Sequence, residues 1–367
     1  MSSAPVKQVL VISLGGAGDG LMATPLLSAL RAQWPETAVD VLVMQGAAAR
    51  DMFAGNPVVR ECVLHDFMHA PAWRSLALGI KLRRRRYDIS FTVMPQNRFE
   101  YNLITWLIGA RRRVGFDFAI RCGALGGLFL TDRVAEDTQA HLIDNNLRLL
   151  SEGIGLAPAS FTPALALPLA SEHRAFAGRV IREQGLAEKR VIGFHPGTGT
   201  TKNLVLRRWA PEKWARLAQL LTVDADCRIL LFGSPDEAPL REEIRRHAGL
   251  RPEQLQDAPA QSILDAAALL ARLDCLVCCD TLLTHLAAAV GTPEVVIMGP
   301  TPHTSVYPHG VPHRIVRLGF ACSPCYGYSR HGIRCTHPQP LACLTGITPE
   351  RVQDAVVSLL AEVERGG

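Results

Sequence analysis

Short apolar runs alternate with helical stretches along most of this chain, and this alternation limits the possible folds more than any other feature. Residues 8–14 (QVLVISL) form a continuous apolar run, typical of a parallel strand buried on both faces. A glycine-rich turn and a helical stretch at about 21–33 follow it. Further strands are predicted at 39–44 and 89–94, with a helix at about 73–86 between them. Such alternation predicts an α/β fold with doubly wound parallel sheets.

The pattern lapses once and then restarts. Residues 155–168 contain three prolines and no helical period, so they are predicted to be a linker. A chain of 367 residues predicts about two domains, at roughly 150 residues per domain. After the linker, the predicted strands are 191–194, 228–232, 276–279 and 295–298, and the predicted helices are 211–221, 281–290 and 349–364. Thr348 is predicted to be the N-cap of the last helix.

The composition excludes several classes of protein. Hydrophobic residues make up 48% and charged residues 20%, which fits a globular protein and not a disordered one. No apolar stretch reaches the ~18 residues that a membrane-spanning helix needs. The first residues carry a short apolar run without a cleavage-site pattern, so no secretory signal is expected. We therefore expect a cytoplasmic protein.

Basic residues gather in one part of the first half. Residues 74–121 hold eleven Lys or Arg against three Asp or Glu. These side chains are either the solvated ends of helices and loops, or a face that meets an anionic partner such as a phosphorylated lipid. No aromatic residues interleave with them at the spacing of a base-stacking platform, so no nucleic-acid partner is expected.

The first candidate loop, residues 15–20 (GGAGDG), directly follows the first predicted strand. It fails the dinucleotide pattern G-x-G-x-x-G, because Leu21 stands at the last glycine position. No acidic residue ends the second strand either, so a nicotinamide cofactor is disfavoured. Asp19 has two possible roles: it caps the following helix, or it offers a carboxylate for chemistry.

The second and third candidate loops suit a diphosphate. Residues 194–202 (FHPGTGTTK) are small and rich in hydroxyls, and Arg207 and Arg208 could complete a phosphate clamp. In the third loop a strand delivers Asp280 and Thr281 to a helix N-terminus, which favours a phosphate. His285 lies on the same helical face as Thr281. The alternative is that Asp280 is an N-cap and that the histidine packs between helices.

In their order and spacing these loops resemble glycosyltransferase family 9, the lipopolysaccharide heptosyltransferases, over almost the whole chain. The motifs that carry the resemblance are Gly18-Asp19 with Thr24-Pro25, Arg207-Arg208-Trp209 with Pro211, residues 233–237 (GSPDE), Asp280-Thr281 with Thr284-His285, residues 298–301 (MGPT), Cys343-Leu344 and residues 347–350 (ITPE). Two positions depart from the family: Leu282 replaces a common glycine, and Arg207 replaces a lysine.

The resemblance implies a GT-B enzyme, in which two Rossmann-like domains face a central cleft. The N-terminal domain, residues 1–165, would bind the acceptor. The C-terminal domain, residues 166–347, would bind the nucleotide sugar, and a helix in residues 348–367 would pack back on the N-terminal domain.

The resemblance also implies an activity, the transfer of a heptose from ADP-heptose to the inner core of lipopolysaccharide with inversion. Asp19 would be the general base. The residues expected to bind the donor are Thr198, Gly199, Thr200, Arg207, Glu237, Asp280, Thr281, Thr284 and His285. Those expected to bind the acceptor are Gly18, Gly20, Arg111 and Arg112. The enzyme would work as a peripheral protein on the cytosolic face of the inner membrane.

Three alternatives remain open. The chain could be a transferase of the same family that uses another nucleotide sugar, and Leu282 leaves the identity of the donor in doubt. It could instead be a non-catalytic protein that binds a sugar nucleotide. A dinucleotide oxidoreductase is disfavoured by the failed glycine pattern.

No metal cofactor is expected for the chemistry. Residues 224–226 (DAD) match a metal-binding D-x-D, but they precede a predicted strand and so lie at the wrong end of the sheet. Four cysteines near the C-terminus have the spacing C-x₂-C-x₉-C-x₇-C, namely Cys322, Cys325, Cys335 and Cys343. They could bind a structural zinc or an iron–sulfur cluster, form disulfides, or stay free thiols.

Overall fold

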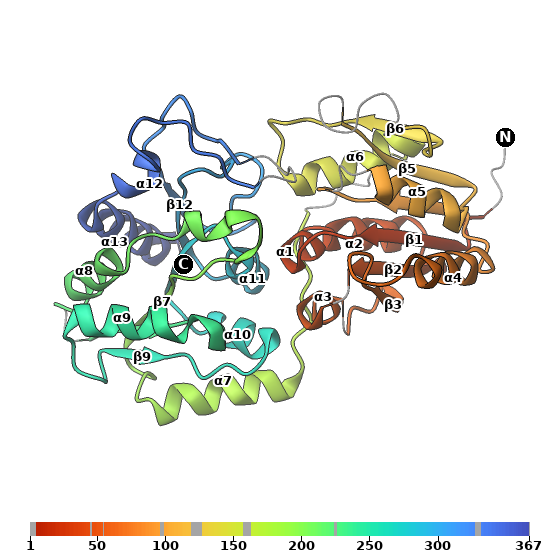
Figure 1. Ribbon diagram of the computed structural model, residues 1–367. Coiled ribbons are helices and arrows are strands. Elements are labelled where there is room, and N and C mark those ends of the chain that lie inside the picture. The colour runs from red at the N-terminus through yellow and green to blue at the C-terminus, as the bar shows by residue number, and fades with distance from the viewer. Residues whose placement is uncertain are drawn as a thin grey trace. The chain divides into compact units, whose positions relative to one another are not determined.

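The computed structural model of the protein describes residues 5–44, 46–53, 55–95, 99–118, 127–156, 163–223, 226–326 and 332–366. The chain divides into two compact units, Met1–Pro168 and Leu169–Gly367. The division falls at the end of the proline-containing segment that is predicted to be the linker, of which residues 157–162 lie outside the described residues. In Figure 1 the first unit runs from red to yellow and the second from yellow-green to blue.

The first unit alternates strands with helices, as the apolar runs predict. Its elements are β1 (Gln8–Ser13), α1 (Ala17–Leu21), α2 (Thr24–Gln33), β2 (Ala38–Met44), α3 (Ala47–Asp51), β3 (Val59–His65), α4 (Ala72–Arg83), β4 (Ile89–Thr92), α5 (Phe99–Ile108), β5 (Arg112–Asp117), β6 (Asp132–Ala135) and α6 (Leu142–Ile154). The helix predicted at about 21–33 is α2, which begins at Thr24 with Pro25 in its first two positions, and the predicted glycine-rich turn before it contains the short helix α1.

The second unit repeats the alternation. Its elements are α7 (Ser171–Glu183), β7 (Arg190–His195), a 3₁₀ helix (Thr201–Arg207), α8 (Pro211–Leu221), β8 (Cys227–Leu231), a 3₁₀ helix (Pro235–Glu237), α9 (Ala238–Ala248), β9 (Leu255–Asp257), α10 (Ile263–Leu270), β10 (Cys275–Cys279), α11 (Leu282–Val290), β11 (Glu294–Ile297), β12 (His313–Val316), α12 (Ala342–Thr345) and α13 (Pro349–Gly366). Thr348 caps α13, because its Oγ1 accepts a hydrogen bond from the Arg351 amide at 3.3 Å.

The two sheets have the same topology, and each contains six strands (Figure 1). The order is β3-β2-β1-β4-β5-β6 in the first unit and β9-β8-β7-β10-β11-β12 in the second. Every strand pair is parallel. The strand order reverses between β1 and β4 and between β7 and β10. In such sheets ligands bind beyond the carboxyl ends of the strands at these switch points, so the loops after β1, β7 and β10 are the ones to examine.

The last helix belongs to the second unit. The apolar side of α13, with Val352, Val356 and Leu359, is buried in the same core as Phe194 and Trp214. The apolar side of this helix thus covers the second sheet, and the expectation that it also packs on the N-terminal domain stays a prediction. Among the described residues, no helix has both the length and the apolar composition needed to cross a membrane.

Candidate functional site

The glycine-rich loop of the first unit lies directly after β1, at the switch point. Gly16 is the N-cap of α1, and its amide donates a hydrogen bond of 2.7 Å to Oδ2 of Asp19. A Cβ atom on Gly15 would lie 2.4 Å from that oxygen, so the loop needs a glycine there. Asp19 therefore caps α1, and it stays partly exposed. Its second possible role, as a base, stays a prediction.

The predicted acceptor-binding residues do not come together. Gly18 and Gly20 lie in α1, next to Asp19. Arg112 begins β5, at the end of the sheet opposite the glycine-rich loop, and pairs with Asp132 at 2.6 Å. Arg111 lies at the same end of the sheet. A part of the basic stretch thus stabilises its own unit, and a role for these two arginines in acceptor binding stays a prediction.

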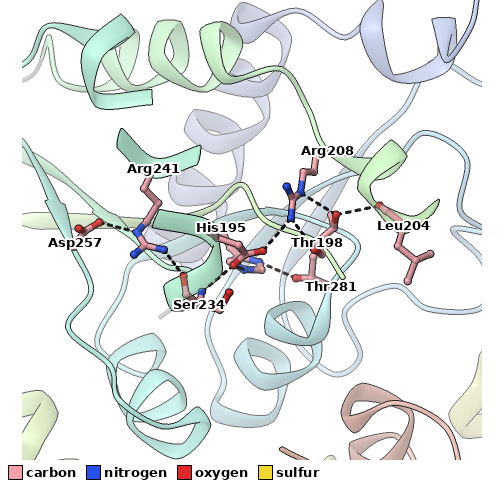
Figure 2. A network of polar contacts seen from close by, with 9 residues as sticks. His195, Thr198, Leu204, Arg208, Ser234, Arg241, Asp257 and Thr281 are labelled. Carbon is pink, nitrogen blue, oxygen red and sulfur yellow. Dashed lines mark hydrogen bonds and ion pairs between the residues drawn. The ribbon is translucent and has the colours of Figure 1, made fainter. Parts of the chain in front are cut away.

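In the second unit, the loops after β7 and β10 meet through His195 and Thr281. The strand register places Cys278 opposite His195, which ends β7. Nδ1 of His195 lies 3.0 Å from Oγ1 of Thr281 (Figure 2). Thr281 is the N-cap of α11, yet its side chain does not cap the helix, since its hydroxyl contacts His195 instead.

The N-terminus of α11 is consequently a suitable anion site. The first amides of a helix have no partner within the helix, and in the described part of the chain no side chain caps those of α11. These amides and the helix dipole favour a negative group beyond the carboxyl end of β10.

Glu237 lies beside this point and is ionised despite its burial. Its Oε2 accepts a 2.8 Å hydrogen bond from the Ser234 amide and lies 3.6 Å from Nε2 of His195. Burial alone would raise the pKa of Glu237, but His195, Ser234 and Arg208 together lower it from 4.5 to about 2. A Cβ atom on Gly197 would lie 1.9 Å from Oε1 of Glu237, so this glycine lets the β7 loop approach the carboxylate.

Hydrogen bonds also fix the β7 loop itself. Oγ1 of Thr198 donates to the Leu204 carbonyl at 3.0 Å, and Arg208 donates to both Oγ1 and the carbonyl of Thr198, at 3.2 and 3.0 Å (Figure 2). Thr198 is buried, whereas Gly199 and Thr200 are exposed. Thr198 therefore shapes the loop, and the exposed pair after it is open to a ligand.

Arg207 and Asp280 form an ion pair at the same edge of the sheet. Nη1 of Arg207 donates to the Asp280 carboxylate, and also to the Asp280 carbonyl at 3.1 Å. The guanidinium carbon lies 5.2 Å from the centre of the Tyr326 ring. Nε of Arg207 is buried and has no hydrogen-bond partner among the described residues. This N–H group is thus an unsatisfied donor at the edge where the loops after β7 and β10 meet.

The next two predicted donor-binding residues lie deeper. Thr284 is completely buried, and its hydroxyl lies 3.2 Å from the Cys278 sulfur and donates to the Cys279 carbonyl at 3.4 Å. His285 is also buried, and burial lowers its pKa although the Asp280 charge opposes this. The Thr284 side chain holds α11 against β10, and a direct contact with the donor stays a prediction for both residues.

His195, Ser234 and Arg241 belong to this network but were not among the predicted site residues. His195 is the last residue of a strand and precedes the glycine loop, so its position alone was a usable signal. Ser234 and Glu237 have the Ser-x-x-Glu spacing of a capping box. Arg241 continues the network, since it donates to the Ser234 carbonyl at 2.9 Å and to Asp257 at 3.0 Å (Figure 2).

The four C-terminal cysteines are free thiols in the structure. Burial raises the pKa of Cys343, and the other three thiols raise it further, so the four lie near one another. No three of their sulfur atoms lie within 4.8 Å of one another in the part of the chain that the structure describes. A four-cysteine metal site is therefore not preformed here, and a zinc or iron–sulfur site stays a prediction.

The D-x-D sequence is at the amino end of a strand. Asp226 precedes β8 and pairs with Lys189 at 2.5 Å, while residues 224 and 225 lie outside the described residues. The location of Asp226 agrees with a surface turn away from the switch point.

Comparison with known families identifies the family of the chain. Residues 75–331 match the model of glycosyltransferase family 9 (heptosyltransferase), which is more than half of the chain. The chain belongs to glycosyltransferase family 9. It is an enzyme of the heptosyltransferase type, and its two Rossmann-like units form the GT-B fold of this family.

Relatives match this family member from end to end. Lipopolysaccharide heptosyltransferase 2 of Escherichia coli is 28% identical over 97% of this chain and 99% of its own length. The structure of the E. coli ADP-heptose lipopolysaccharide heptosyltransferase II is similar, with 25% identity, a TM-score of 0.73 and coverage of 97% and 99%. A family 9 glycosyltransferase from Veillonella parvula has the same fold, with 21% identity, a TM-score of 0.76 and coverage of 97% of each chain.

Proposed function

We propose that this family 9 enzyme transfers a heptose from ADP-heptose to a sugar of the lipopolysaccharide inner core, with inversion at the anomeric carbon. The observation that carries the proposal is the uncapped N-terminus of α11, with Thr281 held by His195 and Arg207 beside it. The end-to-end likeness to a lipopolysaccharide heptosyltransferase, and to a structure named for ADP-heptose, supports the choice of sugar and acceptor.

The second unit would bind ADP through its diphosphate. The amides at the start of α11, the exposed Gly199 and Thr200, and the unpartnered Nε of Arg207 would donate to phosphate oxygens. These donors would stabilise the negative charge that builds on the leaving phosphate as the bond to the anomeric carbon breaks. Since these oriented donors and the helix dipole would stabilise the phosphate charge, the proposed chemistry needs no metal ion.

The first unit would supply the base. An acceptor hydroxyl attacks the anomeric carbon, the bond to the ADP oxygen breaks, and the hydroxyl proton passes to the Asp19 carboxylate. The hydrogen bond from the Gly16 amide supports this role because it fixes the orientation of the carboxylate. Gly18 and Gly20 would let the acceptor sugar approach the backbone of the loop. The reaction would take place at the cytosolic face of the inner membrane, where the lipid-linked acceptor is made.

The test uses purified full-length enzyme, ADP-heptose and lipopolysaccharide that lacks the heptose. We expect ADP release together with a gain of one heptose in the mass of the acceptor. A panel of ADP-, GDP- and UDP-sugars tests the donor in parallel. Turnover of a different nucleotide sugar in place of ADP-heptose would refute the proposed donor, and nucleotide-sugar binding without any transfer would refute the proposed catalysis.

A further inference from the structure

Large apolar side chains lie exposed on neighbouring elements of the first unit. Trp73 is 64% exposed and Trp106 is 48% exposed. Most of the exposed large apolar side chains among the described residues come from this part of the chain, namely Met68, Trp73, Leu76, Ile80, Phe99, Leu103, Trp106 and Leu128. We call the six that lie on α4 and α5 the apolar face: Trp73, Leu76, Ile80, Phe99, Leu103 and Trp106.

Helical spacing makes this face continuous along each helix. On α4 the three residues lie at i, i+3 and i+7, and on α5 at i, i+4 and i+7. The opposite sides of both helices pack on the same face of the sheet, where Leu82 and Ile108 contact the cluster of Leu10 and Ile12. Helices α4 and α5 lie next to each other (Figure 1), and because their buried sides share one core their exposed stripes face outward on the same side of the sheet.

The helices that carry the face are held firmly together. A Cβ atom on Gly79 of α4 would lie 2.5 Å from the Leu107 side chain of α5, so the glycine allows a close approach. Phe129 packs against Phe99 and Trp106, with ring centres 5.3 and 5.8 Å apart. The apolar face is thus part of a packed structure, and an exposed apolar patch on such a structure usually marks a binding surface.

Cations without acidic partners border this face. Arg74, Lys81 and Arg84 have no ion pair among the described residues, and Arg74 lies over the Trp73 ring at 5.2 Å. Arg85, by contrast, pairs with Asp40 at 2.7 Å, away from the apolar stripe. Helix α4 itself contains no acidic residue. The charges that α4 offers to an outside partner are therefore positive and lie next to the apolar face, while α5 adds one exposed acidic residue, Glu100.

We propose that the apolar face docks the enzyme onto an anionic lipid bilayer. The tryptophans and aliphatic side chains enter the interfacial layer, and Arg74, Lys81 and Arg84 contact the lipid phosphates. A symmetric contact with a second copy fits less well, because it would bring the cations of α4 against one another. The purpose of this docking rests on the proposed function, because an acceptor that lies in the membrane requires an enzyme at the membrane.

Vesicle binding of the full-length protein tests the proposal. We expect flotation with phosphatidylglycerol-rich vesicles and much weaker flotation with phosphatidylcholine alone. The double variant Trp73→Ser, Trp106→Ser should lower the partition coefficient at least tenfold, because it removes most of the aromatic area from the face. Its control is Val223→Ser, Val357→Ser, which changes two exposed apolar residues of the second unit.

A charge series separates electrostatics from apolar insertion. Lys81→Glu should lower binding to the anionic vesicles at least fivefold, whereas the control Arg246→Glu in α9 should leave it unchanged. Thermal unfolding of each variant checks the fold. Unchanged flotation of the double tryptophan variant would overturn the proposal, as would a wild-type dimer that the same variant converts to monomer without loss of flotation.

An activity measurement distinguishes docking from catalysis. With the double tryptophan variant, we expect transfer to a delipidated core oligosaccharide to stay at the wild-type rate and transfer to the acceptor in vesicles to fall. If the wild-type protein floats with vesicles but transfers to neither acceptor, then docking stands and the proposed function fails.

Discussion

Glu237 is a carboxylate that the second unit keeps ionised, and its replacement tests how the loops after β7 and β8 are held. The side chain is about one-tenth exposed, and its pKa is lowered from 4.5 to about 2. Glu237→Gln keeps the size of the side chain but removes the charge that His195 and Arg208 face. At neutral pH we expect the variant to be less stable than the wild type.

The magnitude follows from the two pKa values. At about 1.4 kcal/mol per pH unit, the difference between 4.5 and about 2 corresponds to roughly 3 kcal/mol of folding stability. Because the folded-state pKa is the lower one, this stability is fully present above pH 4.5 and is lost as the pH falls towards 2. About 2 kcal/mol of it should be gone at pH 3. The stability of Glu237→Gln has no such dependence on pH, because the glutamine side chain does not titrate.

Scanning calorimetry between pH 7 and pH 3 measures the effect. The unfolding transition to follow is the one that ADP shifts to higher temperature, because it belongs to the unit that would bind the nucleotide. The wild type should lose its advantage over Glu237→Gln as the solution is acidified. Asp236→Asn is the matched control, since Asp236 is the exposed neighbour in the same 3₁₀ helix. A gap between the wild type and Glu237→Gln that does not change with pH would refute the reasoning.

Three further changes test the site. Asp19→Ala should lower the transfer rate at least 100-fold and leave ADP affinity within about twofold; near-normal turnover would exclude this base. Thr281→Val should weaken ADP binding by about tenfold in isothermal titration calorimetry, because it removes the hydroxyl that contacts His195. Gly197→Ala should destabilise the enzyme by about 1–3 kcal/mol in thermal unfolding, because the new methyl group overlaps Glu237; an unchanged midpoint would contradict the close approach.

The central strands of both sheets could be predicted from the sequence because they are buried on both sides. The run predicted at 39–44 is β2 (Ala38–Met44), and the run at 276–279 is β10 (Cys275–Cys279). Strands at the edges were missed for the opposite reason. In β3 and β12 most residues are only partly buried, so no continuous apolar run marks them.

The candidate loops could be predicted as well, since parallel strands place all their carboxyl ends at one edge. The pairings between the loops could not be predicted in this way. Arg207 meets Asp280, and His195 meets Thr281, only because the strand register brings β7 beside β10. Arg112 shows the same limit, since only the fold reveals that it begins β5 and lies at the end of its sheet opposite the glycine-rich loop, and its contact with the acceptor stays a prediction.

The charges around α11 also show what attracts the nucleotide in the proposed reaction. Arg207 is paired with Asp280, and Arg208 lies 3.6 Å from Glu237, so both of these arginines already face an anion. Net charge therefore contributes little to the attraction of a diphosphate. The attraction must come mainly from oriented donors, which are the uncapped amides of α11 and the unpartnered Nε of Arg207. Such donors act only at short range and in fixed directions, and this is why the contact between His195 and Thr281 matters: it anchors the N-terminus of α11 beside the end of β7.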